Sequence, residues 1–99
     1  MNKTIEIRNY SNPNKVVKNL SKLFPKDNYT LKISGRKDKK YAVIGDFTDG
    51  EWVHFGQMGY EDFTYHNDED KRDKFRNRNW RWANRPQYTP AFLSYHILW

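Results

Sequence analysis

Residues 41–55 read YAVIGDFTDGEWVHF and carry the strongest short-range fold signal in the chain. Two runs rich in aromatic and β-branched residues, 41–47 and 51–55, flank Thr48-Asp49-Gly50. An Asp-Gly pair between such runs favours a hairpin, because glycine accepts the positive φ of tight turns. A third strand is predicted at 29–34, where apolar and polar residues alternate. The middle of the chain therefore predicts an antiparallel β-meander.

Helix signals lie on both sides of this meander. Asn12-Pro13 combines a capping side chain with a first-turn proline and predicts a helix that Pro25 ends. Its apolar face would consist of Val16, Val17, Leu20, Leu23 and Phe24. Near the other end, Thr89-Pro90 repeats the start signal and predicts a last helix over 91–99.

Two further elements are predicted from shorter patterns. Ile5 and Ile7 alternate with polar residues over 4–8, which is the period of a half-exposed strand. Asn67, followed by three acids, predicts the cap of a basic helix that runs toward Trp82 and ends at Pro86. The expected fold class is α+β, a small antiparallel sheet packed by two or three helices.

Length and composition set the scale of this fold. The chain has 99 residues, so we expect a single domain, 1–99, with one small core. Only 36% of the residues are hydrophobic, but 17% are aromatic, which disordered chains avoid. There is no cysteine, which excludes disulfides, thiolate metal sites and a cysteine nucleophile. The longest apolar stretch, 90–99, is too short for a membrane span, so no membrane partner is expected.

Charge is strongly segregated along the chain. Residues 1–40 carry a net charge of +8, residues 41–70 carry −8 with no lysine or arginine, and residues 71–99 carry +6. Either the three blocks fold against one another, or the basic blocks form faces for a polyanion. We favour the second explanation, because small proteins usually scatter their charges more evenly.

Two basic segments are the candidate nucleic-acid-binding residues. The turn supplies Arg36, Lys37, Lys39 and Lys40, and the predicted helix places Lys74, Arg78, Arg81 and Arg85 in one stripe. Arginine suits phosphate oxygens, and the neighbouring Trp80 and Tyr88 are candidates for stacking on bases. The alternative is a solvated helix face whose arginines pair with the acidic block. Binding requires that the turn and the helix share one face.

The second half of the chain resembles a known group of proteins. The motifs are Lys39-Lys40-Tyr41, His54-Phe55-Gly56, the run YEDFTYHND at 60–68, Arg72, Phe75, Arg78, Leu93-Ser94 and Leu98-Trp99. Together they resemble a family of short basic proteins of large DNA viruses of algae and protists, and of some phages, over about residues 36–99. Relatives often have histidine after the arginine at Arg78, where this chain has Asn79. The resemblance implies a viral origin without specifying a mechanism.

Histidines and acids in the same region form a second candidate site. Metal ligands would come from His54, Asp62, His66 and Asp68. No compact metal motif is present, so structural roles for these residues are favoured and no cofactor is expected. Ser94 and His96 point in different directions on a helix, and no glycine-rich phosphate loop is present.

The apolar end of the chain allows two interpretations. Tyr95 and Trp99 either complete the core, which is the default, or act as anchors in a partner. The leading hypothesis is a non-enzymatic, virion-associated protein that binds nucleic acid, DNA rather than RNA, in the virion and in the host cytoplasm or nucleus. A minor capsid or cement protein whose basic and acidic blocks meet complementary neighbours is the second hypothesis, and a metal-dependent nuclease is the third. An oligomer is compatible with each of these hypotheses.

Overall fold

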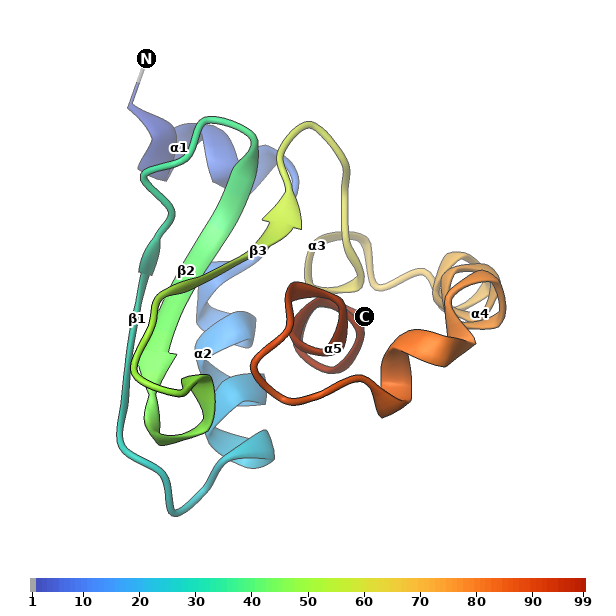
Figure 1. Cartoon of the computed structure of the whole chain (residues 1–99). Helices are drawn as coiled ribbons and strands as arrows, with labels where there is room; N and C mark the ends of the chain where they lie inside the picture. Colours follow the sequence, from blue (N-terminus) through green and yellow to red (C-terminus); the bar gives the residue numbers. More distant parts are fainter. Residues whose placement is uncertain (1) are drawn as a thin grey trace.

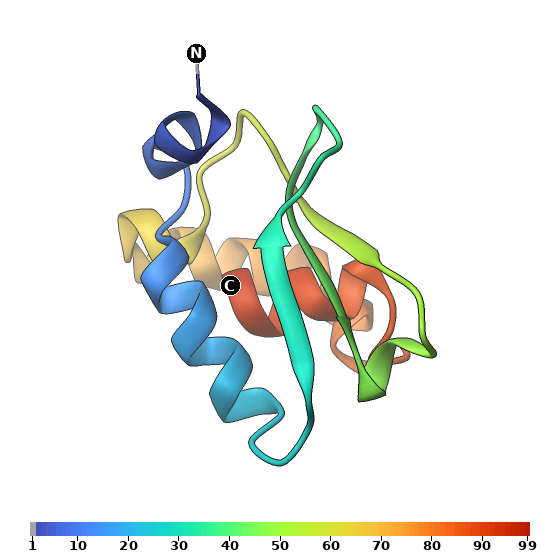
Figure 2. The ribbon, with the colours of Figure 1, turned by 90° about the vertical axis from the view of Figure 1, so that its left-hand side faces the viewer.

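A three-stranded antiparallel sheet forms one layer of the computed structural model, which describes residues 2–99. Its strands are β1 (Tyr29–Ile33), β2 (Lys39–Gly45) and β3 (Val53–Gln57), in that order. The helices α2 (Pro13–Leu23) and α5 (Pro90–Leu93) lie on one side of this sheet, and α4 (Glu69–Arg78) lies beyond them (Figure 1). Figure 2 shows the sheet in front of these helices, with its other face turned to the viewer. The predicted α+β meander is confirmed.

The strand register follows from the alternation in the sequence. Tyr41 pairs with Phe55 and Val43 with Val53, so the large apolar residues of β2 and β3 share one face. Between the strands, the 3₁₀ turn η2 (Asp46–Thr48) ends β2 two residues earlier than predicted. Asp49 and Gly50 both have positive φ, at 58° and 78°, as the turn signal requires.

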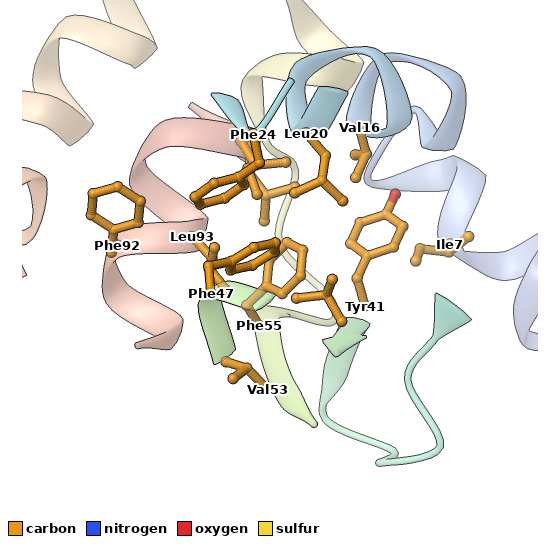
Figure 3. Close-up of a cluster of buried hydrophobic side chains, with 13 residues drawn as sticks. Ile7, Val16, Leu20, Phe24, Tyr41, Phe47, Val53, Phe55, Phe92 and Leu93 are labelled. Carbon is orange, nitrogen blue, oxygen red and sulfur yellow. The ribbon is translucent and has the colours of Figure 1, made fainter. Parts of the chain in front are cut away.

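The core fills the space between this sheet face and the helices (Figure 3). Phe24 of the segment after α2 stacks on Phe47, with ring centroids 3.7 Å apart. The other buried members, drawn with them in Figure 3, come from the sheet and from the helices packed on it, and include Val16, Leu20, Phe55, Phe92 and Leu93. These aromatic and aliphatic side chains supply the apolar burial in a chain of which only 36% of the residues are hydrophobic.

Helix α2 begins where its sequence predicts. The Asn12 side-chain oxygen accepts hydrogen bonds from the amides of Asn14 and Lys15, at 3.1 and 3.3 Å. Val16 and Leu20 are fully buried, whereas Val17 is 51% exposed. The assignment of Val17 to the apolar face is therefore wrong, because a single helix stripe facing one sheet does not reach it.

The segment predicted as a strand at 4–8 is helical. It forms α1 (Lys3–Glu6) and the 3₁₀ turn η1 (Ile7–Asn9), and the Asn2 side chain caps α1 by accepting from the Thr4 amide. Ile7 is buried, but Ile5 is 65% exposed, so the two isoleucines do not share a buried face. A capping asparagine outweighed an alternation of only two apolar residues.

The basic helix is displaced and shorter than predicted. Asn67 adopts a left-handed conformation, φ 53°, and ends the short helix α3 (Phe63–His66). Asp68 caps α4 instead, and α4 ends at Arg78. The 3₁₀ turn η3 (Trp80–Asn84) follows, so the chain changes direction before Trp82.

The last helix begins at Thr89-Pro90 as predicted, and Thr89 caps it through the Phe92 amide. After α5 the chain continues as the π-helical turn η4 (Ser94–Leu98). Phe92, Leu93, Ile97 and Leu98 are buried, which confirms the core interpretation for most of this helix. Within residues 2–99, no helix has the length and apolar character to cross a membrane.

Candidate functional site

A cleft of about 820 Å³ opens between the sheet and the last third of the chain. One wall comes from the start of β2 and the loop after β3, and the other from α4, η3 and η4. Four cationic side chains line the cleft: Lys39, Lys40, Lys71 and Arg78. Six aromatic rings line it as well: Tyr10, Tyr60, His66, Phe75, Trp82 and Trp99. Glu61 is the acid among the lining residues.

The cleft brings the two predicted basic segments together. Lys39 opens β2 and Arg78 closes α4, and both side chains line the cleft. Lys71, Phe75 and Arg78 are spaced by four and three residues, so α4 presents them on one face. The cationic part of the cleft is therefore built from both sides. Lys71 was not predicted as a binding residue.

The basic turn is held in shape by a lysine from α1. The Lys3 ammonium donates to the carbonyl oxygens of Ser34, Arg36 and Lys39, at 2.7, 2.5 and 2.6 Å. These three bonds use all the donors of the ammonium group. They draw the turn's carbonyl groups toward Lys3, while the side chains of Arg36 and Lys37 are exposed to solvent.

Lys40 is not available to a phosphate, and its assignment as a binding residue is wrong. Its side chain is 2% exposed and its Nζ lies 3.0 Å from Oδ2 of Asp62, which is 1% exposed. Burial lowers the pKa of Lys40, and the charge of Asp62 opposes that shift. This lysine forms a buried ion pair beneath the cleft. Among residues 2–99, it is the one ion pair in which the acidic middle block neutralises a predicted binding cation.

A chain of hydroxyl groups extends this ion pair into the core. Thr64 donates its hydroxyl proton to Asp62, so Ser11, 3.1 Å away, donates to Thr64. Tyr41 in turn donates to Ser11 at 2.7 Å, and burial raises the pKa of Tyr41 above its ordinary value. The network ties β2 to the segment before α2 and to α3. It fixes the floor of the cleft.

The continuous cationic stripe predicted over Lys74, Arg78, Arg81 and Arg85 is not present. Helix α4 ends at Arg78, and Asn79 donates its side-chain amide back to the Phe75 carbonyl at 3.1 Å. Arg81 then lies in η3 and Arg85 in extended backbone. Lys74, Arg81 and Arg85 are exposed but do not line the cleft. Arg78 alone of the four reaches it.

Four of the cleft's rings form a continuous row. Trp82 meets Phe75 edge to face at 5.8 Å, Phe75 stacks on Trp99 at 4.2 Å, and Trp99 contacts His66 at 5.3 Å. We call Trp82, Phe75, Trp99 and His66 the aromatic row. It joins η3, α4, the chain end and α3 along one wall of the cleft.

A comparison with protein families matches residues 29–79 to a family of unknown function, DUF5754. The match spans more than half of the chain. The chain belongs to the DUF5754 family. No curated protein and no solved structure matches it. The DUF5754 segment runs from β1 to the end of α4 and just beyond, so it contains the cleft cations Lys39, Lys71 and Arg78.

In this DUF5754 member the predicted stacking residues lie outside the cleft, and the predicted anchor residues contact other side chains of the same chain. Trp80 and Tyr88 are exposed, but neither lines the cleft. Trp99 was expected as a partner anchor, and its ring is instead stacked on Phe75 within the chain. Tyr95 is half-buried, with the Arg76 guanidinium 5.2 Å from its ring. The basic helix thus offers both rings an intramolecular partner, and their role as anchors stays a prediction.

The candidate metal ligands are dispersed. His54 Nδ1 lies 2.7 Å from the Ser34 hydroxyl, and Asp62 is occupied by its buried ion pair. His66 Nδ1 accepts the backbone amide of Asp68 at 2.9 Å. In the part of the DUF5754 chain that the structure describes, no three His, Cys, Asp or Glu side chains gather into a metal-binding group. The arrangement gives these residues structural roles.

Stability should fall on mild acidification. Burial lowers the pKa of both His54 and His66, with nearby cations adding to the shift. Below about pH 6.5 the unfolded chain therefore binds more protons at these two histidines than the folded protein does, so the free energy of unfolding falls as the pH is lowered through that window. Urea unfolding at about pH 5 and about pH 7 measures the effect.

The variant His54→Gln/His66→Gln is the control for this pH effect, because it removes both titrating groups. We expect its stability to change less between the two pH values than that of the parent protein. An equal change in both proteins would contradict the assigned shifts.

Sequence reasoning found three of the four cleft cations, of which Lys40 is neutralised by Asp62, and missed most of the rings. Lys39 and Arg78 were identified from the charge blocks, whereas Tyr60, Phe75 and Trp82 were not assigned to a site. The helical spacing of Lys71, Phe75 and Arg78 was a signal in the sequence for these residues, because it places all three on one face of α4. No local signal places the chain end against α4.

Proposed function

We propose that this protein binds nucleic acid through the cleft, without catalysing a reaction. The observation that supports this most directly is that Lys39 and Arg78, from opposite sides of the fold, line the same cleft. Lys71 adds a third cation there, and Glu61 is the acid that opposes them. Lys40 adds no net charge, because Asp62 neutralises it. The cleft thus has a cationic surplus matched to a phosphate backbone.

The remaining exposed cations would act as outlying backbone contacts. Arg36 and Lys37 sit on the turn that Lys3 holds, next to Lys39. Lys74 is exposed on α4, the helix that carries Lys71 and Arg78. Contacts of this kind increase affinity and position the strand without reading its sequence. DNA remains the preferred ligand in this proposal.

The cellular setting is proposed from the resemblance of residues 36–99 alone. It implies a viral protein, carried in the virion and present in the host cytoplasm or nucleus during infection. The capsid or cement alternative combined basic and acidic blocks that meet complementary neighbours with the terminal helix as an anchor. Since Trp99 stacks on Phe75, that helix supports nucleic-acid binding better than partner insertion.

Salt dependence tests the proposal. With three cations in the cleft, the logarithm of the association constant for single-stranded DNA should fall with the logarithm of salt concentration, with a slope of about −2. Arg78→Ala and Lys39→Ala should each reduce that slope by about 0.7. Fluorescence anisotropy of a labelled strand measures it.

Lys22→Ala is the matched control, because Lys22 is exposed on α2 and does not line the cleft. It should leave the slope close to that of the parent protein. Binding without a salt slope, or no binding at low salt, would contradict the proposed function.

A further inference from the structure

We infer that the cleft seats an unpaired base of a single strand, stacked on Tyr60, while Lys39 and Arg78 hold the adjoining phosphates. This inference rests on the proposed function and specifies which form of nucleic acid the site takes. It follows from the aromatic rings that line the cleft, because the binding of phosphates by cations does not require such rings.

The aromatic lining favours single strands over duplexes. In a duplex the faces of the bases are stacked on one another, so a protein meets phosphates, sugars and base edges. In a single strand the faces are free, and aromatic side chains bind them in any sequence. Four of the six aromatic side chains pack on one another as the aromatic row, but a cleft built only for duplex phosphates does not require the exposed ring of Tyr60 in its lining. The lining matches a ligand that is both anionic and aromatic.

Tyr60 is the ring best placed to receive a base. It lines the cleft but is 69% exposed, whereas the rings of the aromatic row are half-buried and already pack on one another. Gly59, with φ 90°, precedes it, a conformation that other residues rarely adopt. The chain thus turns at Gly59 and leaves a large ring exposed at the cleft. An unpartnered face on so large a ring is available for stacking.

Gly56 and Leu98, which also line the cleft, are closely packed against each other. Gly56, with φ 83°, lies where a side chain would meet Leu98 Cδ1 at 2.8 Å, so the end of β3 presses directly on η4. On the other side the aromatic row is held by stacking, and Arg76 donates to the Trp99 carbonyl at 2.9 Å. A preformed wall reduces the ordering that binding would otherwise require.

The size and polarity of the cleft suit a nucleotide. Its volume of about 820 Å³ falls in the range of small-molecule sites and exceeds what one base needs. Gln57, Glu61 and Ser94 line it beside the rings and offer donors and acceptors to a base edge. The cations supply the phosphate contacts. One nucleotide of a strand can therefore enter while its neighbours remain outside.

Three probes separate base binding from phosphate binding. These are an oligothymidylate of about 12 nucleotides, a strand of the same length made of abasic sites, and a duplex of the same length. We expect the oligothymidylate to bind about tenfold more tightly than the abasic strand, from the stacking of one base. It should also bind more tightly than the duplex. Fluorescence anisotropy at fixed low salt gives the three affinities.

Two variants locate the stacking. Tyr60→Ala should weaken oligothymidylate binding about tenfold and leave the abasic strand unaffected. Tyr65→Ala is the matched control, since Tyr65 is exposed on α3 outside the cleft, and should change neither affinity. Thermal melting checks that both variants are folded.

The outcomes distinguish this inference from the function on which it rests. Equal affinity for the abasic strand and the oligothymidylate, or a duplex that binds best, would overturn base seating and leave phosphate binding intact. An unchanged affinity in Tyr60→Ala would overturn it as well. If none of the three probes binds with a dependence on salt, the proposed function itself fails.

Discussion

Replacing Asp62 with alanine should lower the free energy of unfolding by about 3–5 kcal/mol. The substitution leaves the buried Lys40 ammonium without its partner at 3.0 Å and removes the acceptor of the Thr64 hydroxyl. An uncompensated buried charge is among the most destabilising changes in a small domain. Urea unfolding followed by tryptophan fluorescence measures the loss.

Two further variants interpret this result. Glu61→Ala, at the neighbouring exposed position, should change stability by less than about 0.5 kcal/mol. Lys40→Met/Asp62→Leu replaces the ion pair with apolar side chains and should recover much of the loss, because neither charge is then buried alone. If Asp62→Ala unfolds no more easily than Glu61→Ala, the ion pair does not hold the floor of the cleft.

Reversing the two cleft charges with Lys39→Glu/Arg78→Glu should weaken binding to single-stranded DNA at least about 100-fold at low salt. The change removes two proposed phosphate contacts. It also adds repulsion between the DNA and the cleft that the ends of β2 and α4 line. Both side chains lie at element ends on the cleft surface, so folding should be preserved. Fluorescence anisotropy gives the affinity and thermal melting the control for folding.

Lys18→Glu/Lys22→Glu is the matched pair for this experiment. It makes the same change in net charge on α2, where both lysines are exposed and neither lines the cleft. If binding depended only on long-range attraction by net charge, the two double variants would have equal affinities for single-stranded DNA. A loss of similar size in both would therefore contradict a defined site, whereas a loss confined to Lys39→Glu/Arg78→Glu supports it.

Local signals were enough to predict most of the elements. The meander follows from Asp49-Gly50 and the alternation on either side, and helices α2 and α5 follow from Asn12-Pro13 and Thr89-Pro90. These signals act within a few residues, so tertiary contacts rarely override them. The prediction at 4–8 was wrong because two alternating isoleucines are too few to outweigh a capped turn.

The cleft depends on contacts that no local pattern encodes. Lys40 lies in a basic run that predicts an exposed side chain, yet it is buried and forms an ion pair with Asp62, which is distant in sequence. The stacking of Phe75 on Trp99 likewise joins segments that are distant in sequence. Charge segregation identified the basic segments of the chain, but the fold decides which of their side chains face the same space.

Mapping bound DNA onto the backbone tests most directly the central claim that β2 and α4 form one binding site. Oligothymidylate of about 12 nucleotides is titrated into isotope-labelled protein while the backbone amide resonances are followed by nuclear magnetic resonance. We predict that amides near Lys39, Tyr60, Lys71 and Arg78 shift together along one saturation curve, while those of Lys18 and Lys22 on α2 stay in place. Shifts confined to α2 or to the exposed segment around Trp80 and Tyr88, with the cleft unchanged, would contradict it.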